Sequence, residues 1–137
     1  MDKNTLMTIL PHRDDMLLLN EASRIDGGVA EGYYTVRGDE FFLRGHYPGN
    51  PVVPGVILCE IIAQTSCVLF AGLLSSGTPY YTGIDKVRFR RKVLPGDTIR
   101  TRVAPLREKL GLHVVSGEAY VGDELCVSGE FSFMIIN

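Results

Sequence analysis

The sequence has few cysteines, no excess of positive charge and no glycine-rich phosphate loop, and each absence excludes a class of protein. Cys59, Cys67 and Cys126 form no C-x-x-C pair and have no histidine at metal-ligand spacing, so we expect buried thiols and no metal site. A formal net charge of −2 argues against general affinity for nucleic acid or an anionic membrane. Without a phosphate loop, no nucleotide cofactor is expected.

The amino-terminal residues also lack the basic and apolar pattern of a signal peptide, so we expect the protein in the cytoplasm. The chain has 137 residues, of which 45% are hydrophobic. That length can enclose one self-sufficient core, and we expect residues 1–137 to form a single domain.

The longest apolar stretch of the chain follows a loop rich in proline and glycine. Prolines fix φ and disfavour helix in the preceding residue, so this loop should be stiff and irregular. A first helical turn tolerates Pro54, and the apolar run Val56–Leu74 then predicts a helix buried on nearly every face. A membrane span would need a similar length, but Glu60 and Gln64 interrupt the run and no basic cluster flanks it, so we favour a core helix.

Two polar side chains stand out within this predicted helix. Glu60 and Gln64 are four residues apart and share one face. A buried carboxylate needs either a partner or a raised pKa, and a raised pKa suits a general acid. His46 lies in the stiff loop fourteen residues before Glu60 and could supply the base. A base and an acid at one site would suffice to eliminate water. The alternative is that both residues belong to structural polar contacts such as an ion pair. His12, at the start of a polar loop, is interpreted as structural.

The rest of the chain predicts a short helix and about six strands. A helix is expected over residues 2–10, and the turn Asp26-Gly27-Gly28 predicts a hairpin over residues 21–36. Further strands are expected to begin at Tyr80 and to cover residues 98–105, 111–121 and 124–136. One long helix among strands with hairpin-length connections indicates an α+β antiparallel architecture.

Positive charge is concentrated between residues 86 and 93. If this segment is a strand, alternation places four cations on one face, with Val87, Phe89 and Val93 on the other. A solvated strand face is one interpretation, and a docking surface for an acidic partner is the other. The four cations are Lys86, Arg88, Arg90 and Lys92.

Three blocks of the sequence resemble one family. The stretch GHYPGNPVVPGVILCEIIAQ fits H-aromatic-P-G-x-P-x-x-P-G-x-x-x-x-E, the signature of the FabZ-type 3-hydroxyacyl-acyl carrier protein dehydratases. The segments LPHRDDMLLLN and GIDKVRFRRKVLPGDTI are similar to two further blocks of that family, in the same order. The first of these departs at Asp14 and Asp15, where proline is usual, and at Asn20, where an acid is usual.

The resemblance implies the hotdog fold, in which an antiparallel sheet wraps around a long central helix, assembled as a dimer or a trimer of dimers. It implies that His46 is the base that removes the C2 proton of a thioester. Glu60 of the neighbouring subunit would be the acid that protonates the departing C3 hydroxyl. The Gly55 N–H, at the positive end of the helix, would donate to the thioester carbonyl, with Pro54 and Gln64 also at the substrate site.

The expected activity is dehydration of (3R)-3-hydroxyacyl thioesters to trans-2-enoyl thioesters, as a hydro-lyase of fatty acid synthesis that needs no cofactor. The implied partner is acyl carrier protein, an acidic protein that delivers its substrate on a phosphopantetheine arm and would dock on the four cations. Two alternatives are thioester hydrolysis, which some hotdog proteins carry out with a helix carboxylate, and non-catalytic binding of acyl chains or carrier protein.

Overall fold

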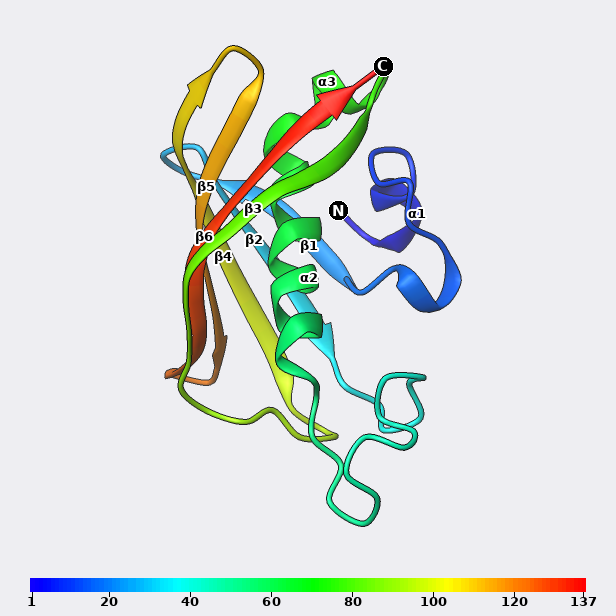
Figure 1. Ribbon diagram of the computed structural model, residues 1–137. Coiled ribbons are helices and arrows are strands. Elements are labelled where there is room, and N and C mark those ends of the chain that lie inside the picture. Colours follow the sequence, from blue (N-terminus) through cyan, green and yellow to red (C-terminus); the bar gives the residue numbers. More distant parts are fainter.

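Six antiparallel strands form one sheet in the order β1-β2-β4-β5-β6-β3, in a computed structural model that describes residues 1–137 (Figure 1). The helical elements are α1 (Lys3–Leu6), α2 (Gly55–Ser66), α3 (Ala71–Leu74) and two 3-10 turns, η1 (Asp14–Met16) and η2 (Cys67–Phe70). The strands are β1 (Glu21–Ile25), β2 (Val29–Thr35), β3 (Thr78–Phe89), β4 (Thr98–Lys109), β5 (Leu112–Val121) and β6 (Glu124–Ile136). The predicted α+β architecture of one long helix and about six antiparallel strands is confirmed.

Helix α2 lies against one face of the sheet and packs on β2, β4, β5 and β6 (Figure 1). Pro54 is its N-cap, and η2 and α3 continue the helical run to Leu74, which agrees with the predicted end. By length and composition alone, Gly55–Leu74 could cross a membrane. In this fold its side chains instead form the core, and the helix approaches β5 so closely that a Cβ at Gly117 would overlap Ile62.

The structure confirms two predictions made from the sequence, the buried cysteines and the β1–β2 hairpin. All three cysteines are free and buried. The hairpin of β1 and β2 turns at Gly27 and Gly28, which both have positive φ. In the same hairpin Tyr34 is buried, whereas the hydroxyl of Tyr33 bonds to Glu31 at the sheet surface.

Strand β3 corrects the predicted alternation of charges. The strand ends at Phe89, and its pairing with β6 shifts between Asp85 and Arg88, where Lys86 has a positive φ of 56°. A bulge adds a residue to one strand and redirects the side chains that follow. Because the strand ends at Phe89, Arg90 and Lys92 lie beyond it; Phe89, expected on the face opposite the cations, is 57% exposed.

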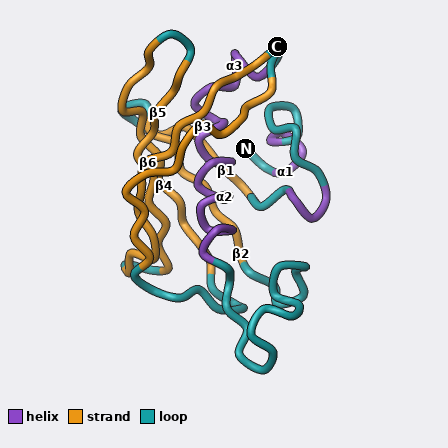
Figure 2. Tube along the Cα trace, viewed as in Figure 1, coloured by secondary structure: helices purple, strands orange, loops and turns teal.

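An irregular segment over residues 36–54 joins β2 to α2 and carries His46 (Figure 2). Glu40 anchors it, since this buried carboxylate accepts bonds from the Tyr34 hydroxyl at 2.7 Å and from the N–H groups of Arg37 and Gly38 at 2.9 and 2.8 Å. Burial raises the pKa of Glu40, but the three donors outweigh burial and hold the pKa below its ordinary value.

We expect Glu40→Gln to lower the free energy of unfolding by about 1–3 kcal/mol at neutral pH, because the amide cannot accept all three bonds. The folded pKa of Glu40 lies below the unfolded one, so its stabilisation is complete above the unfolded pKa and lost as pH falls through the folded pKa. Urea unfolding at neutral and acidic pH should therefore show a weaker acid dependence in the variant. Glu21→Gln, at an exposed carboxylate, is the control, and an equal effect of both substitutions would contradict this role of Glu40.

Candidate active site

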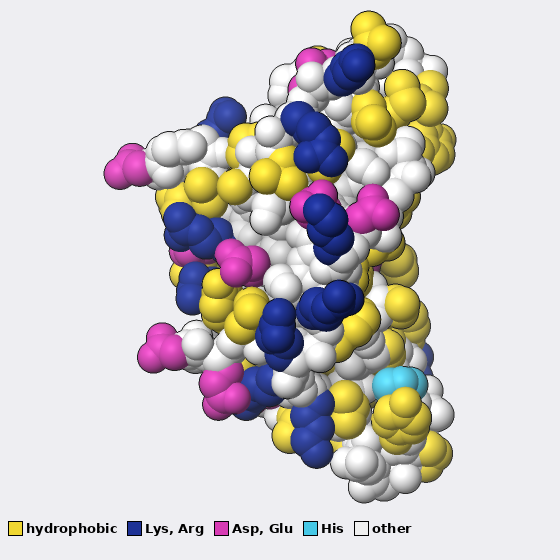
Figure 3. Space-filling view, turned by 60° about the vertical axis from the view of Figure 1, so that its left-hand side comes forward, with side chains coloured by type: hydrophobic (Ala, Val, Ile, Leu, Met, Phe, Trp, Pro, Cys, Tyr) yellow, Lys and Arg dark blue, Asp and Glu magenta, His cyan; other side chains and the backbone are white.

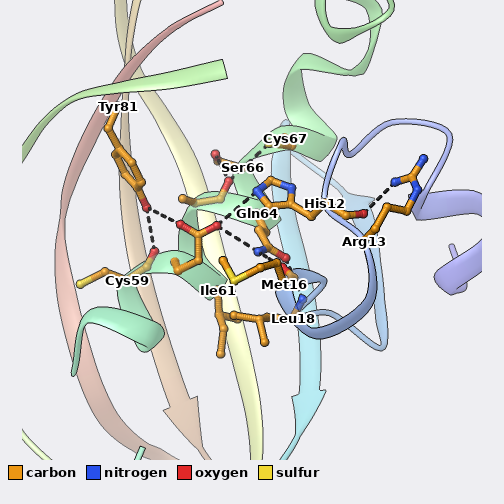
Figure 4. A network of polar contacts seen from close by, with 12 residues as sticks. His12, Arg13, Met16, Leu18, Cys59, Ile61, Gln64, Ser66, Cys67 and Tyr81 are labelled. Carbon is orange, nitrogen blue, oxygen red and sulfur yellow. Dashed lines mark hydrogen bonds and ion pairs between the residues drawn. The ribbon is translucent and has the colours of Figure 1, made fainter. Parts of the chain in front are cut away.

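Three donors from separate parts of the chain converge on the carboxylate of Glu60 (Figure 4). His12 Nε2 lies 3.3 Å from Oε2, and the Gln64 amide donates to the same oxygen at 3.0 Å. The Tyr81 hydroxyl lies 3.4 Å from Oε1. Glu60 comes from α2, Tyr81 from β3 and His12 from the amino-terminal loop, so the site forms only when the chain is folded.

Gln64 is fixed by its own partners and is buried. Its carbonyl oxygen accepts from the Leu18 N–H at 2.9 Å, and its amide donates to the Met16 carbonyl at 2.7 Å. Every polar atom of this side chain is thus used, and the amide can point in only one direction. The predicted sharing of a helix face by Glu60 and Gln64 is confirmed as a direct hydrogen bond, and Gln64 acts on the site by holding Glu60.

The ionisation of Glu60 is decided by these donors. Burial raises the pKa of Glu60, while the hydrogen bonds from His12, Gln64 and Tyr81 lower it, and the pKa lies below its ordinary value. The sequence left open whether Glu60 has a partner or a raised pKa. In this protomer it has partners, and it is a carboxylate at neutral pH.

A cavity of about 150 Å³ opens beside Glu60. Its lining is mostly apolar or uncharged, with Pro79, Tyr80 and Tyr81 contributed by β3. Burial raises the pKa of the Cys67 thiol, which also lines the cavity, to about 12. A thiol with this pKa stays protonated at neutral pH and is a poor nucleophile.

His46 is oriented by the backbone of its own loop. Its Nδ1 lies 2.7 Å from the Val52 carbonyl oxygen, and its ring stacks on Tyr47 with centroids 4.2 Å apart. A carbonyl oxygen can only accept, so Nδ1 carries the proton and donates it to this bond. The lone pair is then on Nε2, which is the form of histidine that acts as a base.

A second cavity, of about 360 Å³, lies at the start of α2. It is lined by Val52 and Gly55 on one side and by Phe89 and residues 90–92 on the other. The N–H groups of a first helical turn have no partner within the helix, so the Gly55 N–H is suited to bind an oxygen. Phe89 lies directly against Gly55, where a Cβ would come within 2.6 Å of the ring.

Within one protomer, His46 and Glu60 do not meet. Glu60 lines the first cavity, whereas His46 contacts Val52, which lines the second, and neither side chain bonds to the other. Pro54 caps the helix beside the second cavity and makes no side-chain cap bond. The predicted site residues therefore fall into two groups: Glu60 with Gln64, and His46 with Pro54 and Gly55.

The comparisons with known proteins bear on this divided site. A family model described as a FabA-like domain matches residues 10–130. The chain is 39% identical to the 3-hydroxyacyl-[acyl-carrier-protein] dehydratase FabZ of Moorella thermoacetica, over 98% of this chain and 96% of the relative. It is 37% identical to that of Alkaliphilus metalliredigens, over 96% and 92%. The chain belongs to the FabZ-type dehydratases of the FabA-like family.

Solved structures confirm the fold predicted for this FabZ-type chain. The dehydratase heterocomplex ApeI:P of Xenorhabdus doucetiae superposes with a TM-score of 0.81, at 19% identity, covering 96% of this chain and 91% of that one. The Escherichia coli PaaI protein gives a TM-score of 0.65 at 15% identity, covering 83% and 81%. At such identities the likeness concerns the fold, which is the hotdog.

The sequence did not reveal two residues of this FabZ-type site. His12 was interpreted as structural, and Tyr81 was seen only as part of a strand, yet both lie against Glu60. The signal that could have identified them is their position relative to the blocks shared with the family. His12 lies in the block LPHRDDMLLLN, and Tyr81 lies just before the block that begins at Gly83. No local pattern indicates that these blocks meet α2.

Proposed function

We propose that this chain removes water from (3R)-3-hydroxyacyl thioesters of acyl carrier protein and forms trans-2-enoyl thioesters, in the cytoplasm. Membership of the FabZ-type dehydratases supports the reaction. The observation that carries the mechanism is the Nδ1–H of His46 on the Val52 carbonyl, which leaves Nε2 as a base. Glu60, in a largely uncharged cavity, is the matching acid.

In the proposed reaction His46 Nε2 takes a proton from C2, and the electron pair of that C–H bond becomes the C2–C3 double bond. The C3–O bond breaks, and the hydroxyl leaves as water with a proton from Glu60. The Gly55 N–H donates to the thioester oxygen, where negative charge develops. Afterwards the proton on His46 returns to Glu60 through solvent, so both groups are restored.

Glu60 must hold a proton when the hydroxyl leaves, although in the free protomer it is ionised. An acyl chain that enters the cavity displaces water, and loss of solvation disfavours the charged form of a carboxyl group. Substrate binding therefore raises the pKa of Glu60 and prepares it as the acid. Glu60 is therefore ready to donate a proton only when an acyl chain occupies the cavity.

The two groups of site residues would come together in a two-fold dimer. Strand β3 is an edge of the sheet, is twelve residues long and exposes Tyr80, Ile84 and Phe89. An exposed edge of this kind is open to pairing with a second chain. Antiparallel pairing of β3 with its own copy would place the end near Tyr81 and Glu60 against the partner's end near Phe89 and Gly55.

We further propose that acyl carrier protein docks beside the second cavity. Arg90 and Lys92 are exposed at its lining, and Lys86 and Arg88 lie just before them on β3. Figure 3 shows Lys and Arg side chains along the outer side of the sheet, with fewer acidic ones among them. An acidic partner would be attracted to this side of the molecule.

The double substitution Arg90→Glu and Lys92→Glu is expected to raise KM for a carrier-bound substrate about tenfold or more, and more strongly at low salt. A small soluble thioester of the same acyl group should be turned over as before. Lys109→Glu, at the exposed end of β4, is the control. Equal losses with both substrates would contradict docking at these residues.

Mass spectrometry of (3R)-3-hydroxyacyl carrier protein incubated with the purified chain tests the proposed function. Loss of water from the acyl group is the expected result. Release of free carrier thiol would point to hydrolysis instead. Binding with neither reaction, over several chain lengths and with a folded protein, would leave only the non-catalytic alternative.

A further inference from the structure

We propose that His12 is a positioning residue that holds Glu60 in place for proton transfer, by donating from Nε2 to one of the two carboxylate oxygens. The inference rests on the proposed function, because it takes Glu60 to be the acid. It concerns a histidine that lies outside the signature from His46 to Glu60, in the amino-terminal loop.

The contact between the two side chains is well enclosed. His12 Nε2 lies 3.3 Å from Glu60 Oε2, with only 22% and 21% of the two side chains exposed. The other ring nitrogen, Nδ1, is buried without any partner. A buried N–H without an acceptor is costly, so the favoured neutral ring has its proton on Nε2, directed at Glu60.

The two oxygens of Glu60 have unequal surroundings. Oε2 receives both the His12 and the Gln64 donors, at 3.3 and 3.0 Å. Oε1 has only the Tyr81 hydroxyl, at 3.4 Å, and that hydroxyl lies equally far from the Cys59 carbonyl. A hydroxyl has one proton to donate and Tyr81 can direct it to either acceptor, so Oε1 receives fewer hydrogen bonds than Oε2. We assign Oε1 as the oxygen that exchanges the proton with substrate.

The loop that carries His12 is held in place by hydrogen bonds from Arg13 to backbone carbonyls. Arg13 donates to the carbonyls of Leu10 and His12, both at 2.7 Å, and to that of Met7 at 2.9 Å. A few residues later, Leu18 and Met16 hold Gln64. Both donors to Oε2 are therefore set by one amino-terminal segment, residues 10–18, which lies on the side of α2 away from the sheet (Figure 1).

No other lining residue of this cavity could replace His12. The remaining titratable groups that face Glu60 are Tyr81 and Cys67, and burial raises the pKa of both. Tyr81 lies against Oε1, and the Cys67 thiol donates to the Ala63 carbonyl, so within this cavity only His12 joins Gln64 as a donor to Oε2. Removal of His12 should affect the chemical step more than substrate binding.

Three substitutions of His12 separate positioning from packing. A Gln amide nitrogen reaches the place of Nε2, an Asn amide nitrogen reaches only the place of Nδ1, and Leu offers no donor. We expect His12→Leu and His12→Asn to lower kcat about 10–100-fold with KM nearly unchanged, and His12→Gln to retain most of kcat. Asp15→Asn, on the same segment with an exposed side chain, is the control.

A second readout does not depend on activity. Carbon-13 NMR of Glu60 should show its carboxyl titrating at higher pH in His12→Leu than in the unsubstituted protein, with His12→Gln in between. If the unsubstituted protein does not dehydrate any substrate, the proposed function fails, while this titration still tests the His12 contact. Equal kcat for Asn and Gln, or an unchanged titration in His12→Leu, would overturn the proposal.

Discussion

Glu60→Gln is expected to lower kcat for dehydration by about 10²–10⁴-fold, and His46→Ala by a similar factor. The Gln amide keeps the size of Glu60 and an oxygen that can accept from His12 and Gln64, but it has no acidic proton for the leaving hydroxyl. His46→Ala removes the Nε2 lone pair and leaves the start of α2 unchanged. Both substitutions should leave KM within a few-fold, because they act on the chemical step.

Stopped-flow absorbance of the enoyl thioester, with thermal unfolding of each variant, measures both effects. Glu21→Gln, at an exposed carboxylate of β1 that lines neither cavity, should keep the rate of the unsubstituted protein. A Glu60→Gln protein that is folded and still dehydrates at the original rate would show that Glu60 is not the acid. A His46→Ala protein that is folded and still dehydrates at the original rate would show that His46 is not the base.

The sequence was sufficient where structure follows from local pattern. The apolar run after Pro54 predicted the central helix to within a few residues, and the glycines at 27 and 28 predicted the β1–β2 hairpin, because each depends only on neighbouring residues. Strand β3 was harder. Its bulge at Lys86 depends on pairing with β6, so simple alternation does not hold between Asp85 and Arg88.

The candidate site was only half predictable for the same reason. Glu60 and Gln64 are one helical turn apart, and their contact follows from helix geometry. The contact of His12 with Glu60 depends on how the amino-terminal segment packs on α2, which no periodicity in the sequence records. The separation of His46 from Glu60 also required the fold, since sequence distance alone could not show that their cavities differ.

A mixture of the His46→Ala and Glu60→Gln chains is expected to recover activity that neither chain has alone. If each site takes His46 from one subunit and Glu60 from the other, a mixed dimer has one site with both substitutions and one site with neither. Random pairing makes half of the dimers mixed, so the recovered rate should be about a quarter of the unsubstituted rate per chain.

Co-expression of the two chains yields the randomly paired mixture, and two affinity tags then isolate the mixed dimer, which should have half of the unsubstituted rate per chain. A site formed within one chain would give no recovery, because every chain in the mixture is defective. The reverse control combines the unsubstituted chain with the His46→Ala and Glu60→Gln double variant. Every site of that mixed dimer has one defective residue if sites are shared, so the mixed dimer should be inactive, whereas sites within one chain would leave it half active. The opposite responses of the two mixtures thus distinguish a shared site from a dimer that is merely needed for folding.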